Sequence, residues 1–195
     1  MNVLSNSSKR RPLALLLAAA LVVAGGAIAL SIFVVARLTK VVRFPLERTP
    51  YVLGLEYTDV SFPSRDDCLE IHGWLIKAEN DGRTVIMIHG EYRHRDHPEL
   101  KMLELARDLH QHGYSVLMID LRGHGESQGD RTSAGYYEKR DVLGAIDYLK
   151  GLGIPSPKVA LLGFSLGAAT SILAAAEERE IGGVISDSSF ANLKE

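Results

Sequence analysis

Gly163-Phe164-Ser165-Leu166-Gly167 separates a predicted strand from a predicted helix. An apolar run, residues 159–162, precedes it, and residues 166–179, which are rich in small side chains, have a helical pattern. A turn this tight leaves no room for side chains at its two glycines, because they would collide with the neighbouring strand and helix. It also forces the serine into a strained backbone conformation that exposes its hydroxyl. The positive end of the helix dipole then lies beside Ser165 and favours an anion there.

The chain after residue 50 alternates between strand-like and helical patterns. Its first two strands are separated by a turn-like segment and are predicted to form an antiparallel pair. The later strands are separated by helices, and such repeated units imply a parallel sheet with helices on both faces. Asp96 is predicted to cap the first of these helices. The predicted strands are 57–62, 69–77, 84–88, 114–119, 158–162 and 183–186, and the predicted helices are 97–112, 136–150 and 166–179.

Two further motifs follow strands of this predicted sheet. His89-Gly90-Glu91 comes directly after strand 84–88, and Asp120-Leu121-Arg122-Gly123-His124-Gly125-Glu126-Ser127 comes directly after strand 114–119. Together with the pentapeptide, they resemble the α/β-hydrolase superfamily over residues 51–195. The resemblance is strongest to the bacterial membrane-tethered branch of serine aminopeptidase-like and general hydrolases, which Asp187-Ser188-Ser189-Phe190 also fits. It implies an α/β-hydrolase fold that is truncated after its sixth strand.

The resemblance assigns roles to residues of all three motifs. It implies that Ser165 is the catalytic nucleophile and that the backbone N–H groups of Glu91 and Leu166 form the oxyanion hole. His89 is then expected to hold its loop by hydrogen bonds, and Asp120 and Arg122 to pair with each other or with the backbone. Gly90, Gly163 and Gly167 complete the set of residues that support the site.

The catalytic triad is incomplete in this sequence. In the resembling family the order is serine, acid, histidine, but no histidine follows Ser165 and the last one in the chain is His124. A rim-loop histidine such as His124 is more often structural, so we do not assign it as the base. Asp187 follows the sixth strand, where a few family members place the acid, although a loop or capping role is the preferred interpretation. The histidine and the acid are therefore expected to lie outside this chain.

These features favour a membrane-anchored serine hydrolase that cleaves an ester, thioester or amide through an acyl-enzyme on Ser165. The substrate would be a small-molecule, lipid or peptide acyl compound. The alternative is a non-catalytic membrane-tethered fragment, or a binding protein derived from an α/β hydrolase. Nothing in the sequence implies a cofactor or a metal, and it contains no zinc-type Cys/His spacing. The oligomeric state is left open.

The N-terminal segment is predicted to anchor the chain in a membrane. Residues 13–36 carry no charge, and as a helix they would span about 36 Å, against roughly 30 Å of bilayer hydrocarbon. A cleaved signal peptide is the alternative, because Ala27-Ile28-Ala29 fits a cleavage site, but the apolar run is longer than usual for one. Residues 1–12 are then a basic tail, 37–50 a linker and 51–195 the hydrolase-like domain. Both flanks are basic, and the free amino terminus favours placing the domain on the extracytoplasmic side of the cell membrane.

The charge distribution argues against a nucleic-acid partner. The 195 residues carry a net charge of −2, but residues 1–48 hold seven basic residues against one acidic residue. The remainder holds 15 basic and 23 acidic residues, and a nucleic-acid-binding domain would need a basic face of its own. The single cysteine, Cys68, excludes an intrachain disulfide bond.

Overall fold

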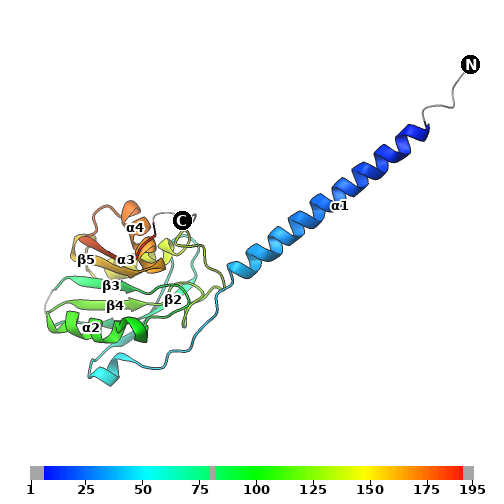
Figure 1. Ribbon diagram of the computed structural model, residues 1–195. Helices are drawn as coiled ribbons and strands as arrows, with labels where there is room; N and C mark the ends of the chain where they lie inside the picture. The colour runs from blue at the N-terminus through cyan, green and yellow to red at the C-terminus, as the bar shows by residue number, and fades with distance from the viewer. Residues whose placement is uncertain (1–6, 80–81, 191–195) are drawn as a thin grey trace, which may run out of the picture. The chain divides into compact units, whose positions relative to one another are not determined.

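The computed structural model describes residues 7–79 and 82–190, and for residues 7–13 the backbone only. It divides into two compact units, residues 1–40 and 41–195. The first unit contains helix α1, Ser7–Leu38 (Figure 1). Its segment Ala14–Leu38 has a mean hydropathy of 2.5 and is long and apolar enough to cross a membrane, a test that a signal sequence near the N-terminus also passes. The predicted span, 13–36, falls within this helix.

The second unit is built on a six-stranded mixed sheet in the order β1-β2-β4-β3-β5-β6. The antiparallel pairing predicted for the first two strands is confirmed, and β2 also pairs antiparallel with β4. β4, β3, β5 and β6 run parallel, which confirms the predicted α/β architecture. The strands are β1 (Thr58–Pro63), β2 (Glu70–Ile76), β3 (Thr84–Ile88), β4 (Ser115–Ile119), β5 (Val159–Phe164) and β6 (Gly183–Asp187). The α-helices are α2 (Met102–Gln111), α3 (Lys139–Gly151) and α4 (Leu166–Glu177), and three short 3-10 helices are η1 (Pro50–Leu53), η2 (Pro98–Leu100) and η3 (Ser156–Lys158).

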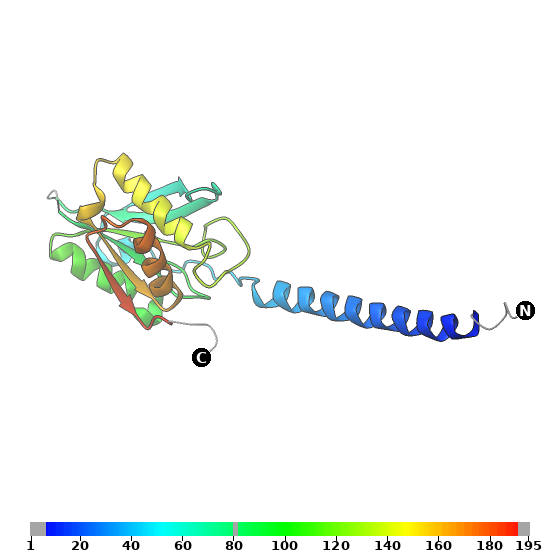
Figure 2. The same ribbon diagram turned by 90° about the horizontal axis from the view of Figure 1, so that it is seen from above.

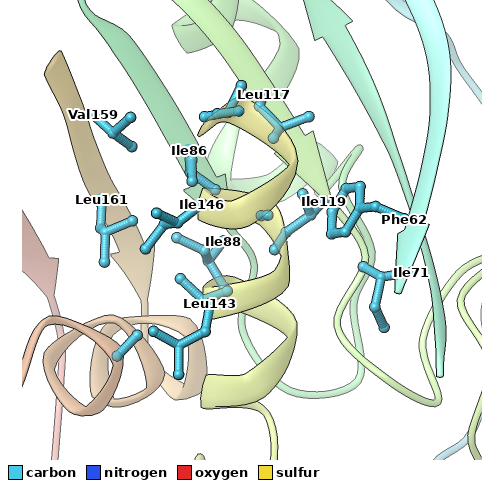
Figure 3. Packing of buried hydrophobic residues seen from close by; sticks show 14 of the residues in the cluster. Phe62, Ile71, Ile86, Ile88, Leu117, Ile119, Leu143, Ile146, Val159 and Leu161 are labelled. Atoms are coloured by element: carbon cyan, nitrogen blue, oxygen red, sulfur yellow. The ribbon is translucent and has the colours of Figure 1, made fainter. Parts of the chain in front are cut away.

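Helices cover both faces of the sheet, as predicted (Figure 2). On one face, α3 and α4 bury their apolar sides against the strands, and Figure 3 shows Leu143 and Ile146 of α3 against Ile86 and Ile88 of β3. On the other face, α2 packs on a second apolar cluster that includes Trp74. The strands in the middle of the sheet are buried on both faces, which explains why β3 and β4 are continuous apolar runs.

Two helices begin later than their sequence pattern predicts. Asp96 does not cap the first one, because its carboxylate forms an ion pair with Arg48 (2.8 Å). Lys101 has a left-handed backbone (φ 51°), so α2 starts at Met102 after the short helix η2. Before α3, the Glu138 carboxylate accepts N–H groups of residues 133 and 135 and fixes a turn where a helix was expected.

The segment expected to be a linker, 37–50, is largely part of the domain. We name residues 41–44 the strap. The Val41 N–H donates to the carbonyl of Asp130 (3.0 Å), and the Val41 side chain is buried. The Arg43 guanidinium donates to the carbonyls of Gly125 (2.8 Å) and Gly129 (2.7 Å). Only residues 39 and 40 therefore connect the end of α1 to the first residue fixed on the domain.

Candidate active site

Ser165 occupies a strained turn between β5 and α4. Its backbone has φ 51° and ψ −111°, and the residue is exposed. A Cβ on Gly163 would overlap the carbonyl of Gly167, and a Cβ on Gly167 would overlap the carbonyls of Ile88 and His89. Both glycines are therefore required by close backbone approach, and the strain at Ser165 is the kind that functional sites retain.

The loop after β3 lies directly against this turn. A Cβ on Gly90 would be 3.4 Å from both the Ser165 Cβ and the Phe164 carbonyl oxygen. Glu91 is the next residue, and Leu166 is the first residue of α4, where backbone N–H groups have no acceptor within the helix. The backbone segments expected to supply both oxyanion-hole donors are thus placed on either side of Ser165.

His89 holds this loop to the neighbouring one. Its Nε2 accepts the Leu121 N–H (3.0 Å), so its Nδ1 carries the proton and donates it to the Gly90 carbonyl (2.6 Å). The residue is completely buried. Burial, together with the nearby His124 ring, lowers the pKa of His89 well below its usual value, so the ring is neutral at physiological pH. His124 is also buried, and burial lowers its pKa as well.

Asp120 and Arg122 do not pair with each other, but Asp120 does pair with the backbone, which was the other expected arrangement. Asp120 accepts the backbone N–H groups of Arg95 (2.7 Å) and Glu126 (3.0 Å), and its other partner is the buried Arg95 guanidinium (2.6 Å). The guanidinium of Arg122 binds Asp141 and Asp67, both at 2.7 Å. These ion pairs fix the loop that His89 contacts.

Sequence reasoning missed the acidic and basic partners in these pairs. Arg95, Asp67 and Asp141 lie 25, 55 and 19 positions from the residues that they bind. The sequence does contain a sign that Asp141 is buried and paired. It precedes Ala145 by four residues and so falls on the apolar side of α3. A carboxylate in that position needs a buried partner.

A cavity of about 410 Å³ opens beside Ser165. Asp187 lines it, and the Asp187 carbonyl accepts the Ser165 N–H (2.8 Å), while the Asp187 carboxylate accepts the Ser188 hydroxyl (2.8 Å). Besides Ser165 and Asp187, the lining residues are Gly90, Glu91, Tyr92, Arg93, His97, Leu100, Phe164 and Ser188. Burial, and then the charge of Glu138, raises the pKa of Glu91. Within the described ranges, no group of three or more histidine, cysteine or acidic residues is placed to hold a metal ion.

His97 is the histidine that this cavity contains, and sequence reasoning did not nominate it. Its Nε2 accepts a hydrogen bond from Arg93 Nε (2.9 Å) and lies 3.0 Å from a carboxylate oxygen of Glu99. Burial, and then the charge of Arg93, lowers the pKa of His97. The ring is therefore neutral and its accepting nitrogen is occupied by Arg93, which makes it a poor base for Ser165.

The comparisons with known proteins agree with this geometry. Residues 79–195 match the family model described as serine aminopeptidase, S33. The chain belongs to this family of α/β hydrolases. Among solved structures, the Pyrococcus furiosus esterase Pf2001 is similar to the chain with a TM-score of 0.70 and 32% identity over 77% of the chain.

Two curated proteins are also similar to the chain in sequence. The thiohydrolase aneE of Aspergillus aculeatus is 31% identical over 67% of the chain. The Bacillus subtilis protein called "Uncharacterized protein YqkD" is 33% identical over 66% of the chain. The chain spans 41% and 37% of the lengths of these two relatives, and 58% of the esterase.

Proposed function

We propose that this hydrolase is anchored in a membrane and cleaves an ester, thioester or amide through an acyl-enzyme on Ser165. The observation that carries the proposal is the strained backbone of Ser165, φ 51°, with the loop of Gly90 packed against it. Strain of this kind costs about 1–3 kcal/mol, and a fold retains it where the exposed side chain has a function. The name of the thiohydrolase relative supports including thioesters.

The proposed chemistry begins when the Ser165 hydroxyl oxygen attacks the acyl carbon and its proton passes to a base. The resulting oxyanion is stabilised by the N–H groups of Glu91 and Leu166, and one such donor is worth about 3–4 kcal/mol of the barrier. Collapse expels the alcohol, thiol or amine with that proton. Water, deprotonated by the same base, then releases the acid and restores Ser165.

The base and the acid that orients it are proposed to come from residues outside these 195. No histidine follows Ser165 in the sequence, and His97 at the cavity is bound by Arg93. The chain also spans less than half the length of either curated relative. Asp187 at the cavity remains a candidate for the acid.

The test is labelling by a fluorophosphonate, which reacts with activated serine hydroxyls. The product of the natural gene, read to its natural stop codon, should be labelled, and Ser165→Ala should abolish labelling. Ser189→Ala, an exposed serine outside the cavity lining, is the matched control and should be labelled like the unchanged protein. Labelling that survives Ser165→Ala would show that another residue is the nucleophile.

Two further samples locate the base. If the base lies outside the 195 residues, this chain should be labelled at least about a thousandfold more slowly than the full-length gene product. Removing a member of a catalytic triad lowers the reaction rate by at least that factor. If the 195-residue chain labels at the full rate and His97→Gln abolishes this, the base is His97 and the proposed origin outside the chain is wrong.

A further inference from the structure

We propose that the strap and the Tyr136-Tyr137 turn contact the headgroup region of a phospholipid bilayer, so that the candidate active site opens close to the membrane surface. This rests on the proposed membrane anchoring by α1. It does not depend on the proposed catalytic chemistry. The proposal follows from the length of the connection, the position of the strap on the sheet, and the side chains exposed there.

The connection to the anchor is very short. The segment that can cross a membrane ends at Leu38, and Val41 is already hydrogen-bonded to Asp130 on the domain. Three steps of extended chain separate these two residues, which limits their separation to about 10 Å. Whatever the angle between the helix and the domain, Val41 must therefore lie close to the membrane surface.

The strap binds the same edge of the sheet that carries Ser165. It is hydrogen-bonded to residues 125, 129 and 130, which follow the carboxyl end of β4. Ser165 follows the carboxyl end of β5, which is parallel to β4 through β3. The guanidinium of Arg93, which lines the cavity, lies 6.0 Å from the centre of the Phe44 ring. The strap thus ends at the rim of the cavity.

Apolar and aromatic side chains are exposed along this edge. Val41 and Arg43 face the domain, and the alternate residues Val42 and Phe44 are 57% and 41% exposed. Tyr136 and Tyr137 are 60% and 45% exposed. They belong to the segment that follows residue 130, where the strap is hydrogen-bonded to the domain. This segment is the yellow-green loop in Figure 2.

The Tyr136-Tyr137 turn packs against the helix that begins at the candidate active site. A Cβ on Gly135 would lie 3.4 Å from the Thr170 hydroxyl, in the second turn of α4. A cation lies over each ring, Lys139 at 5.1 Å from Tyr136 and Arg140 at 5.0 Å from Tyr137. Tyrosine is enriched at membrane interfaces because its ring is amphipathic. Both cations also pair with carboxylates, Lys139 with Glu177 and Arg140 with Asp67, so the exposed rings carry the proposed contact.

The experiment measures how close single sites come to lipid in the complete 195-residue chain, reconstituted in phosphatidylcholine vesicles. Cys68 is exposed, so Cys68→Ser provides the background. Val42→Cys and Tyr137→Cys each carry an environment-sensitive fluorophore. Leu152→Cys is the matched control, since it is 47% exposed and lies at the opposite, amino edge of the parallel strands. Lipids with a nitroxide near the headgroup quench a fluorophore within contact distance.

We expect strong quenching at positions 42 and 137 and little at position 152. Equal quenching at all three positions, or stronger quenching at 152, would overturn the proposal. If the protein fails to float with the vesicles, the anchoring itself is wrong and the proposal falls with it. Fluorophosphonate labelling of Ser165 would stand in either case, because it does not require a bilayer.

Discussion

At the scale of a single residue, Gly167 allows the start of α4 to pack against the end of β3 and the loop that follows it. Its α-carbon lies so close to the carbonyls of Ile88 and His89 that a methyl group would overlap them. Gly167→Ala should destabilise the domain by about 1–3 kcal/mol, the usual cost of forcing extra atoms into a packed site. Thermal unfolding measures this. Gly151→Ala, at an open position in α3, is the control and should leave the melting temperature unchanged or raise it.

Asp67 gives a pH-dependent prediction at the same scale. Burial opposes its charged form, but hydrogen bonds from Arg122 and Ser64 outweigh burial and lower its pKa to about 2. In the unfolded chain the pKa is about 3.9. Because the folded pKa is depressed, the stabilisation from charged Asp67 is complete above the unfolded value and is lost as the pH falls towards about 2.

Asp67→Asn should therefore lower the free energy of unfolding at neutral pH. The difference in free energy of unfolding between this variant and the unchanged protein should shrink as the pH falls from about 4 towards about 2. Urea titrations at a series of pH values measure it, with Asp59→Asn, an exposed aspartate on β1, as the control. A difference that stays constant with pH would contradict the role assigned to the Asp67 charge.

At the scale of elements, sequence predicted strands better than helix starts. β3, β4 and β5 are short, buried and continuous, so their composition is sufficient to identify them. The starts of α2 and α3 depend on distant or local carboxylates. Asp96 pairs with Arg48, 48 positions away, and does not cap α2. Glu138, which the pattern placed inside a helix, fixes the turn before α3.

In the candidate site, too, local features were predictable from the sequence and long-range contacts were not. The glycines of the turn around Ser165 were predictable because a short motif and its flanking elements define the required backbone. The ion pair between Arg122 and Asp141 was not, since tertiary contacts select its partners. The docking of the strap was missed for a similar reason, because Arg43 binds carbonyl groups, which every residue has.

β6 is the last strand of the sheet in the described part of the chain. Its residue Ile185 is 59% exposed, and an apolar edge strand promotes pairing between molecules. Ile185→Lys should reduce aggregation of the detergent-solubilised 195-residue chain, as measured by light scattering, without lowering its melting temperature. Leu152→Lys, at a similarly exposed position outside the sheet, should not. Equal effects of both changes would attribute the aggregation to surface hydrophobicity in general.

At the scale of the whole molecule, membrane topology is testable with the single cysteine. The anchor predicts a protein that resists alkaline extraction from membranes and keeps its complete N-terminal segment, whereas cleavage after Ala29 would leave a chain that starts at Leu30. Cys68 is exposed on the domain. If the domain is extracytoplasmic, as the sequence analysis expects, a membrane-impermeant maleimide should label Cys68 in intact cells. Labelling that appears only after lysis would place the domain inside.

The central claim is the proposal that Ser165 is a catalytic nucleophile. Trypsin cleaves after Lys158 and Arg179, so Ser165 lies on the peptide 159–179. After reaction of the natural-length protein with a fluorophosphonate, mass spectrometry should find the phosphonyl group on this peptide, and fragmentation should place it on Ser165. A modification placed on any other residue, or an unmodified peptide from protein that hydrolyses an ester substrate, would contradict the claim.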